Sequence, residues 1–169
     1  MKHPPIQNHP YPIPRFAEYD KRSDKPGEQQ IFIDLSVALT GFTEAELKST
    51  GLVELYFDEL ALVVGYEIRG RFLEAAAGAP DAVMQNGNLW QPLAQNLLRL
   101  WYLGQWKRMP EGWAKANFND ASRKGYDEFG RDADRVISPQ SYQEGLVWRA
   151  IGVNPPGAKQ PGFASWETI

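Results

Sequence analysis

The side chains best suited to acid–base chemistry are three carboxylates in the first half of the chain, Glu54, Asp58 and Glu59. Glu54 and Asp58 are four residues apart, so a helix would place both on one face. Such a pair acts as general acid and base, or binds a metal ion, when a histidine or a second carboxylate pair faces it. The only histidines, His3 and His9, lie in a proline-rich N-terminal segment, and no second pair has matching spacing. We therefore interpret the three carboxylates as a solvated acidic face.

The composition excludes several other kinds of site. The chain has no cysteine, which removes disulfides, thiolate nucleophiles, iron–sulfur clusters and cysteine-based zinc sites. The sequence contains no P-loop, GxSxG, HExxH or EF-hand pattern, so we predict no catalytic, cofactor-binding or metal-binding residue in this chain. A net charge of -3 and a pI near 5.4 argue against a nucleic-acid partner. No apolar run approaches the roughly 18 residues of a membrane span.

Aromatic residues are the strongest signal. The stretch from Leu98 to Trp106 holds two tryptophans and a tyrosine, and we predict that its helix runs to about Met109. At roughly 100° per residue, Trp101 would share one face with Leu97, while Tyr102 and Trp106 would lie on a second face. A single small core uses only one of these faces, and Trp and Tyr dominate protein interfaces. The second face is therefore a candidate partner surface, unless other segments of the chain cover it.

Local signals place the remaining elements. A helix is predicted to run from Glu28 to a C-cap at Gly41, and Thr43 with Glu46 forms a capping box for the next helix. Asn88 is positioned to cap the aromatic helix. Two further helices are predicted: one from Leu52 to about Ala77, in which Gly65 and Gly70 allow a bend or a close neighbour, and one from Ser138-Pro139 to Gly152.

These signals predict an all-α chain with a small domain of four to five helices. We expect an extended proline-rich N-terminal arm over residues 1–29, a helical domain over residues 30–152 and an extended C-terminal tail over residues 153–169. Within the domain, residues 111–136 are polar and contain glycine, so they are predicted to form a long surface excursion held in place by its aromatic side chains. No stretch alternates convincingly enough to predict a strand.

Four short blocks of this sequence, in order between residues 31 and 166, resemble a known family. They are Phe32 to Gly41, Ala94 to Gly104, Ser141 to Leu146, and Pro161-Gly-Phe163 with Trp166. The family is the small (gamma) subunit of bacterial FAD-dependent sugar and alcohol dehydrogenase complexes, of the glucose, fructose, sorbitol and gluconate dehydrogenase types.

The resemblance implies a helical subunit without a cofactor of its own. Its partner would be a large FAD-containing flavoprotein of the glucose-methanol-choline (GMC) type, often beside a multihaem cytochrome c. The family's small subunit supports folding of the catalytic subunit and frequently carries a twin-arginine export signal for both. A periplasmic location is therefore implied, but this chain has no such signal, so a cytoplasmic location stays open. The excursion at residues 111–136 is a second departure from the family.

We therefore expect a non-catalytic accessory subunit that binds and stabilises a flavoprotein. The residues predicted to form its partner interface are Trp101, Tyr102, Trp106, Trp113, Tyr142, Trp148, Pro161, Phe163 and Trp166. Two alternatives remain: a helical module that buries the same aromatics against copies of itself, and a small enzyme with a polar pocket containing Glu54, Asp58 or Glu67.

Overall fold

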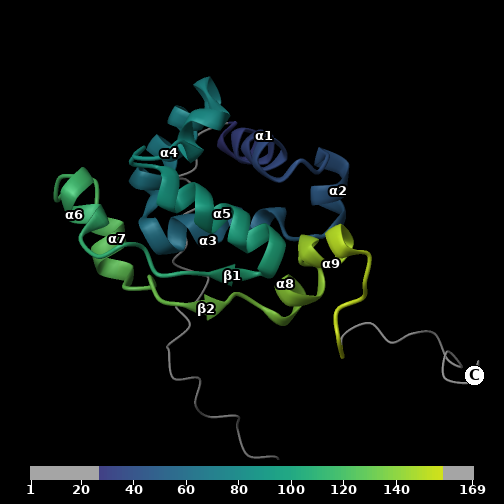
Figure 1. Cartoon of the computed structure of the whole chain (residues 1–169). Helices are drawn as coiled ribbons and strands as arrows, with labels where there is room; N and C mark the ends of the chain where they lie inside the picture. The colour runs from purple at the N-terminus through teal and green to yellow at the C-terminus, as the bar shows by residue number, and fades with distance from the viewer. Residues whose placement is uncertain (1–26, 158–169) are drawn as a thin grey trace, which may run out of the picture.

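A computed structural model describes residues 27–157 of the chain, and it is all-α as the sequence predicts (Figure 1). Four helices of 12 or 13 residues form the body of the fold. The elements in order are α1 Glu28–Thr40, α2 Glu44–Ser49, α3 Val53–Val64, α4 Tyr66–Gly78, the 3-10 helix η3 Pro80–Met84, α5 Gln91–Leu103, β1 Gln105–Trp106, α6 Trp113–Asn117, α7 Lys124–Phe129, β2 Arg135–Val136, α8 Pro139–Gln143 and α9 Leu146–Ile151. The N-terminal arm up to residue 26 and the tail from residue 158 lie outside the described residues.

Several capping residues lie at helix ends that the sequence predicts. Gly41 ends α1 in the left-handed conformation at φ 75°. The Thr43 hydroxyl accepts a hydrogen bond from the Glu46 amide, and the Glu46 carboxylate accepts one from the Thr43 amide at 2.8 Å. Hydrogen bonds that the Thr43 hydroxyl and then the Thr43 amide donate to the Glu46 carboxylate lower its pKa. Ser138 caps α8 by accepting from the Ser141 amide at 3.0 Å, as predicted. The prediction that Asn88 caps α5 is wrong: Trp90 is the N-cap, and Asn88 accepts a hydrogen bond from the Trp90 amide at 2.9 Å.

Three predicted helix boundaries are wrong because glycines break the helices earlier. The predicted helix from Leu52 to Ala77 divides into α3 and α4 at Gly65, whose φ of 83° and ψ of 156° are not helical. The aromatic helix ends at Leu103 instead of Met109, because Gly104 adopts a left-handed conformation and the chain enters β1. The last predicted helix divides into α8 and α9 around Gly145.

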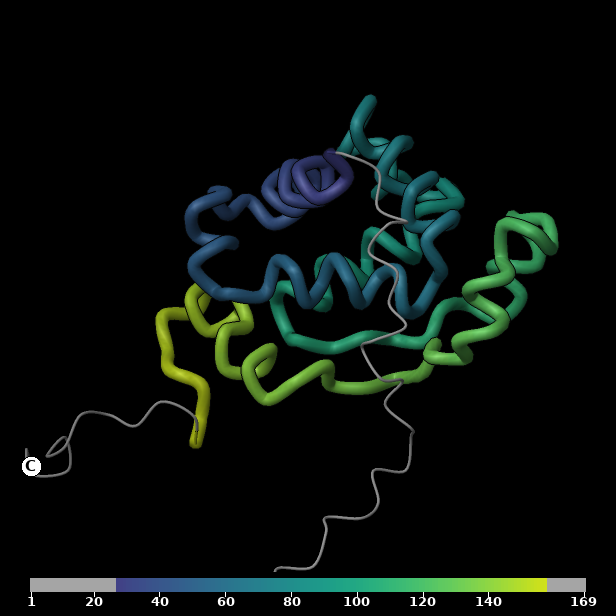
Figure 2. Tube along the Cα trace, turned by 180° about the vertical axis from the view of Figure 1, so that it is seen from behind, coloured from purple at the N-terminus to yellow at the C-terminus, as the bar shows by residue number. Residues whose placement is uncertain are grey.

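The excursion at residues 111–136 has more structure than the sequence predicts. It contains α6, α7 and β2, and β2 pairs antiparallel with β1 through Gln105 with Val136 and Trp106 with Arg135. This two-stranded ribbon joins the two ends of the molecule. Figures 1 and 2 both show α6 and α7 at one end and α8 and α9 at the other.

Trp101 lies at the centre of the core, where α1, α3 and α5 meet. Its ring is 1% exposed and packs edge-on against Tyr56 at 5.0 Å between centroids. Its indole N–H donates to the Ser36 hydroxyl at 2.9 Å, so its one polar group is paired inside the core. Burial of the Tyr56 phenol raises its pKa to about 12. The core is therefore closed around the aromatic face of α5.

An ion pair is enclosed where α1 crosses α4. Arg69 is fully buried, and its guanidinium lies 2.9 Å from the Glu28 carboxylate and 4.0 Å from the centre of the Phe57 ring. Gly70 makes room for this contact, because a Cβ at residue 70 would lie 3.1 Å from Glu28 Oε1. The close approach that the sequence predicts at Gly70 is therefore real.

Candidate functional site

Three of the predicted interface residues lie inside the chain instead of on its surface. Trp101, Trp106 and Trp113 are 1%, 1% and 6% exposed. The prediction that these three rings meet a partner is wrong for the chain as folded, because its own segments cover them. The helix ends before Trp106, so this ring does not share a helical face with Tyr102.

Asp132 explains how the excursion covers Trp106. Its carboxylate accepts hydrogen bonds from the Trp106 indole at 2.9 Å, from the Met109 amide at 2.9 Å and from the Tyr126 hydroxyl at 2.7 Å. Burial and this bond to Asp132 raise the pKa of Tyr126. A single carboxylate thus holds β1, α7 and the segment before β2 together.

Trp113 is held from a different direction. Its indole N–H donates to the Leu89 carbonyl at 2.8 Å, and its ring packs against Phe118 at 5.3 Å and Tyr126 at 6.2 Å. The excursion therefore folds back on the body, the alternative that the sequence left open for these aromatics.

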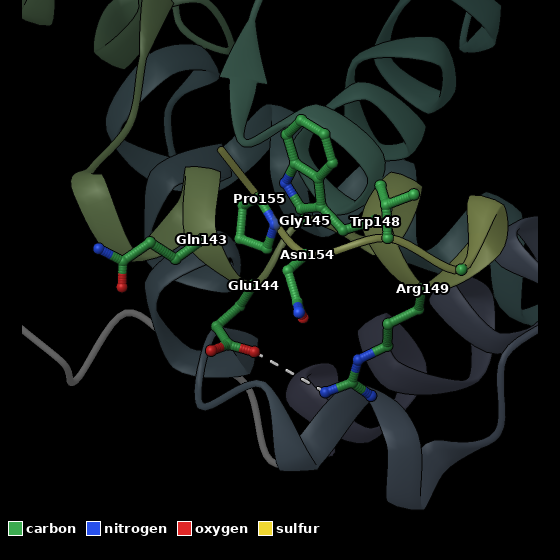
Figure 3. A pocket seen from close by; sticks show the side chains of 9 residues that line it. Gln143, Glu144, Gly145, Trp148, Arg149, Asn154 and Pro155 are labelled. Atoms are coloured by element: carbon green, nitrogen blue, oxygen red, sulfur yellow. Dashed lines mark ion pairs between the residues drawn. The ribbon is translucent and has the colours of Figure 1, made fainter. Parts of the chain in front are cut away.

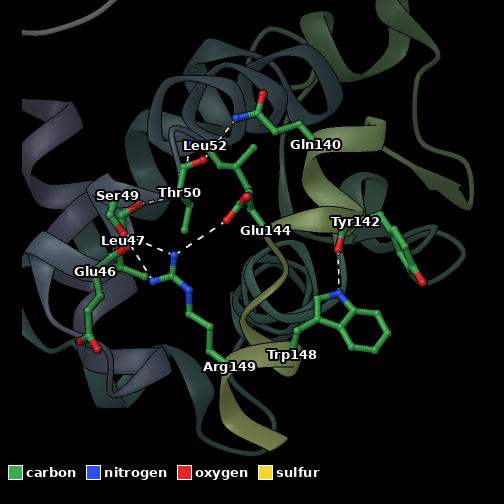
Figure 4. Close-up of polar contacts among 10 residues, drawn as sticks. All are labelled: Glu46, Leu47, Ser49, Thr50, Leu52, Gln140, Tyr142, Glu144, Trp148 and Arg149. Carbon is green, nitrogen blue, oxygen red and sulfur yellow. Dashed lines mark hydrogen bonds and ion pairs between the residues drawn. The ribbon is translucent and has the colours of Figure 1, made fainter. Parts of the chain in front are cut away.

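Tyr102, Tyr142 and Trp148 are the predicted interface residues that stay partly exposed. Tyr102 donates its hydroxyl proton to the Thr40 carbonyl at 3.0 Å and packs edge-on against Phe42. Trp148 donates to the Tyr142 carbonyl at 2.7 Å, and the two rings meet edge-on at 5.4 Å (Figure 4). These hydrogen bonds fix the polar edges of Tyr102 and Trp148, so what they can offer a partner is ring surface.

A groove of about 260 Å³ lies beside Trp148 (Figure 3). We call it the C-terminal groove; its lining residues are Gln143, Glu144, Gly145, Trp148, Arg149, Gly152, Val153, Asn154 and Pro155. Figure 3 shows Glu144 and Arg149 facing each other across it, 3.8 Å apart, with Asn154 directed toward this pair. The groove therefore combines one acid, one base, two amides and an indole ring.

Hydrogen bonds to the C-terminal end of α2 hold α8 and α9 in place. The Arg149 guanidinium lies 3.3 Å from the Ser49 hydroxyl, and Gln140 donates to the Thr50 carbonyl at 3.2 Å (Figure 4). Gly145 allows α9 to approach α5, because a Cβ there would lie 2.8 Å from the Tyr102 carbonyl oxygen. The groove is thus anchored to the body at several points.

Two aliphatic side chains extend the exposed apolar surface beside the groove. Ile151 is 60% exposed and Val153 is 50% exposed. Both are held by a Schellman motif, in which the Val153 amide donates to the Trp148 carbonyl at 3.0 Å and the Gly152 amide donates to the Arg149 carbonyl at 3.2 Å. We call Tyr142, Trp148, Ile151 and Val153 the apolar rim. The two rings were predicted from the sequence, but Ile151, Val153, Arg149 and Asn154 were not, although the predicted helix stop at Gly152 was a signal for this region.

The interpretation of Glu54, Asp58 and Glu59 as one solvated acidic face is wrong for Glu59. Glu59 is buried and forms an ion pair with Arg135, whose pKa is lowered by burial. Glu54 and Asp58 also interact within the chain. Within residues 27–157, no group of three or more acidic or histidine side chains is arranged to hold a metal ion. None of the helices in that range is both long and apolar enough to cross a bilayer.

The last three predicted interface residues, Pro161, Phe163 and Trp166, lie outside the described residues. The chain matches no protein-family model, no curated protein and no solved structure. The family resemblance therefore depends on its four sequence blocks.

Three of these blocks contact one another in the fold. The Trp101 indole of the second block donates to Ser36 of the first at 2.9 Å. At the end of the second block, Gly104 packs so closely on Ser141 of the third that a Cβ would lie 2.5 Å from the Ser141 carbonyl carbon. Residues of these three blocks therefore pack against one another where α1, α5 and α8 meet. These contacts lie within the chain, so they support a role of the blocks in the fold and say little about a partner.

Proposed function

We propose that this chain is a non-catalytic accessory subunit that binds a larger protein through the apolar rim and the C-terminal groove. The observation that carries the proposal is the exposure of the apolar rim on a fold whose own core is complete. Tyr142 and Trp148 offer ring surface, and Ile151 and Val153 offer aliphatic surface, in fixed positions. Rigid aromatic anchors surrounded by polar groups are typical of interface hot spots, and neighbouring apolar contacts exclude water from them.

The proposed partner is a large FAD-containing subunit of the GMC type, with a multihaem cytochrome c as a further member of the complex. This part of the proposal depends on the resemblance of the four blocks to the small subunit of sugar and alcohol dehydrogenases. FAD and catalysis would then reside in the partner, and the complex would be periplasmic like others of its family.

The accessory role follows from mass action. A subunit that binds only the folded flavoprotein lowers the free energy of that state and so raises the yield of folded partner. No side chain of the accessory subunit needs to touch substrate or flavin. Arg149 and Glu144 lie at the edge of the rim, where they would favour a partner with complementary charges and disfavour others.

Co-expression of the flavoprotein with and without this chain tests the proposal. We expect the chain to raise the soluble, flavin-containing yield of the partner. The double variant Ile151→Asp/Val153→Asp should bind the partner at least about tenfold more weakly, because it places charges in an apolar contact. Leu89→Asp is the matched control: Leu89 is also an exposed apolar residue, 41% exposed, but it precedes α5, away from the rim.

Two outcomes would contradict the proposal. The first is an equal yield of flavinated partner with and without the chain. The second is a double variant that binds as tightly as the Leu89→Asp control. A free chain that is a stable dimer, and becomes a monomer in the double variant, would favour the self-assembling helical module instead.

A further inference from the structure

The described chain ends beside the C-terminal groove. Asn154 and Pro155 form part of its wall, Pro155 is buried, and Gly157 adopts a left-handed turn conformation at φ 75°. Residues 158–169 therefore start within a few residues of the apolar rim. They are the segment of this chain that is tethered closest to the groove.

The composition of this segment fits the surface beside which it starts. It carries Pro161, Phe163, Trp166 and Ile169, but only two charged side chains, Lys159 and Glu167. The groove likewise holds one acid, Glu144, and one base, Arg149, beside the exposed Ile151 and Val153. The segment and the groove thus each carry one charge of either sign, and the rings of the segment have apolar surface to cover.

We propose that residues 158–169 fold back onto the C-terminal groove of the same chain, with Phe163 and Trp166 packed on the apolar rim. The reach is sufficient: an extended chain advances up to about 3.5 Å per residue, so the roughly six residues from Gly157 to Phe163 reach about 20 Å. The helix α9, with its 6 residues, is only about 9 Å long.

Residues 158–169 are favoured over a second copy as the occupant of the groove, because they are attached to the same chain. A tether of only a few residues gives an effective concentration on the order of mM, so a contact with a dissociation constant of about 1 mM is substantially formed within one chain. A second copy at about 10 μM would fill only about 1% of such sites. Two aromatic anchors need to supply no more than this weak affinity.

The proposal also has a consequence for assembly, which depends on the proposed function. A partner that docks on the apolar rim must displace the tail or bind on top of it. The tail would then shield the aromatic surface in the free subunit. Tail docking itself is a property of the free chain and can be tested without any partner.

Paramagnetic relaxation in the full-length chain tests the docking. Because the chain has no cysteine, Ser165→Cys places a single nitroxide label between Phe163 and Trp166. We expect the label to broaden the amide signals of Gly145, Trp148 and Val153 selectively, while the signals of α6 at the opposite end of the molecule (Figure 1) stay sharp. The same label in a chain that also carries Phe163→Ser and Trp166→Ser should lose at least about half of this broadening, because the rings anchor the tail.

Three results would overturn the proposal. The first is absence of broadening at the groove, and the second is equal broadening in the doubly substituted chain. The third is broadening of an isotope-labelled chain by a separate spin-labelled chain in a mixed sample, which would make a second copy the occupant. Adding the flavoprotein to the labelled chain is a separate measurement: loss of binding there contradicts the proposed function and leaves the tail result standing.

Discussion

Arg69 is a buried cation that is stabilised by two neighbours, Glu28 and Phe57. Its guanidinium pairs with Glu28 at 2.9 Å and lies over the Phe57 ring at 4.0 Å, and both charged side chains are almost fully enclosed. Removing one partner of such a pair leaves an uncompensated buried charge, which costs about 3–5 kcal/mol. We expect Arg69→Met to destabilise the chain by about 3 kcal/mol in urea unfolding, since Glu28 begins α1 and can regain some water.

Two further variants serve as comparisons for the stability of Arg69→Met. Adding Glu28→Gln to Arg69→Met should restore at least about half of the lost stability, because the orphaned charge is removed. Lys48→Met breaks an exposed pair with Glu44 on α2 and should change stability by less than about 0.5 kcal/mol. Equal effects of Arg69→Met and Lys48→Met would mean that the buried pair contributes nothing special.

Tyr56 makes the stability of the chain sensitive to alkaline pH. Burial raises the pKa of its phenol to about 12, whereas the unfolded chain ionises near 10. The folded state therefore holds the proton more tightly, and stability is full below pH 10 and falls as the pH rises toward 12. At pH 11 the expected loss is about 1.4 kcal/mol, which corresponds to one pH unit of differential proton binding.

The variant Tyr56→Phe isolates this effect from other groups that titrate. We expect urea unfolding to show a loss between pH 8 and pH 11 that is smaller in Tyr56→Phe than in the wild type by about 1.4 kcal/mol. The comparison at pH 8, where the phenol is protonated in both states, corrects for the effect of the substitution itself. Parallel pH profiles for the two proteins would contradict a buried, proton-holding Tyr56.

At the scale of elements, the junction of α5 with α8 depends on Gly104. Its φ is 65°, and a Cβ would lie 2.5 Å from the Ser141 carbonyl carbon. Gly130 has a similar φ of 55° at the end of α7, but a Cβ there would meet nothing within 4 Å. Both glycines therefore adopt a left-handed backbone conformation, but only Gly104 lies in close contact with another element.

This pair gives a matched prediction. Gly130→Ala should cost about 1 kcal/mol for the left-handed conformation alone. Gly104→Ala should cost about 1–3 kcal/mol more, because α8 must move away from α5. Urea unfolding of both variants measures the difference, and equal costs would show that α8 does not pack tightly on α5.

The same glycines explain which element boundaries the sequence could predict. Gly41, Thr43 with Glu46, and Ser138 act through their own neighbours in the chain, so their capping roles were predictable from local pattern. Gly65 breaks a helix where the backbone of Gly125 packs against it, and Gly104 does so against Ser141. Both contacts join distant parts of the chain, so the sequence marked these positions as permissive but did not show that the helices end there.

At the scale of the whole molecule, the fold determines which aromatic side chains the chain covers with its own segments. The sequence showed many rings along α5 and the excursion, but the prediction that a partner must cover them is wrong for Trp101, Trp106 and Trp113, which are buried within the chain. The sequence did not show that Asp132 holds Trp106 and Tyr126 together, because this contact spans 26 residues between Trp106 and Asp132. The candidate surface that remains is therefore smaller than predicted and centred on α8 and α9, where Tyr142 and Trp148 were the residues identified in advance.

Because the proposed partner binds the apolar rim of the folded chain, binding should raise the stability of this chain. A partner that binds only the folded chain adds about 2.7 kcal/mol of apparent stability at a concentration of 100 times its Kd. For a chain of this size, each kcal/mol shifts Tm by about 2–4 °C, so binding should raise Tm by about 5–10 °C. The shift should grow with partner concentration in thermal scans followed by a probe on this chain. It should vanish in Ile151→Asp/Val153→Asp and persist in Leu89→Asp. A shift that survives in the double variant would place the partner on another face of the molecule, because the rim would then add nothing to the bound state.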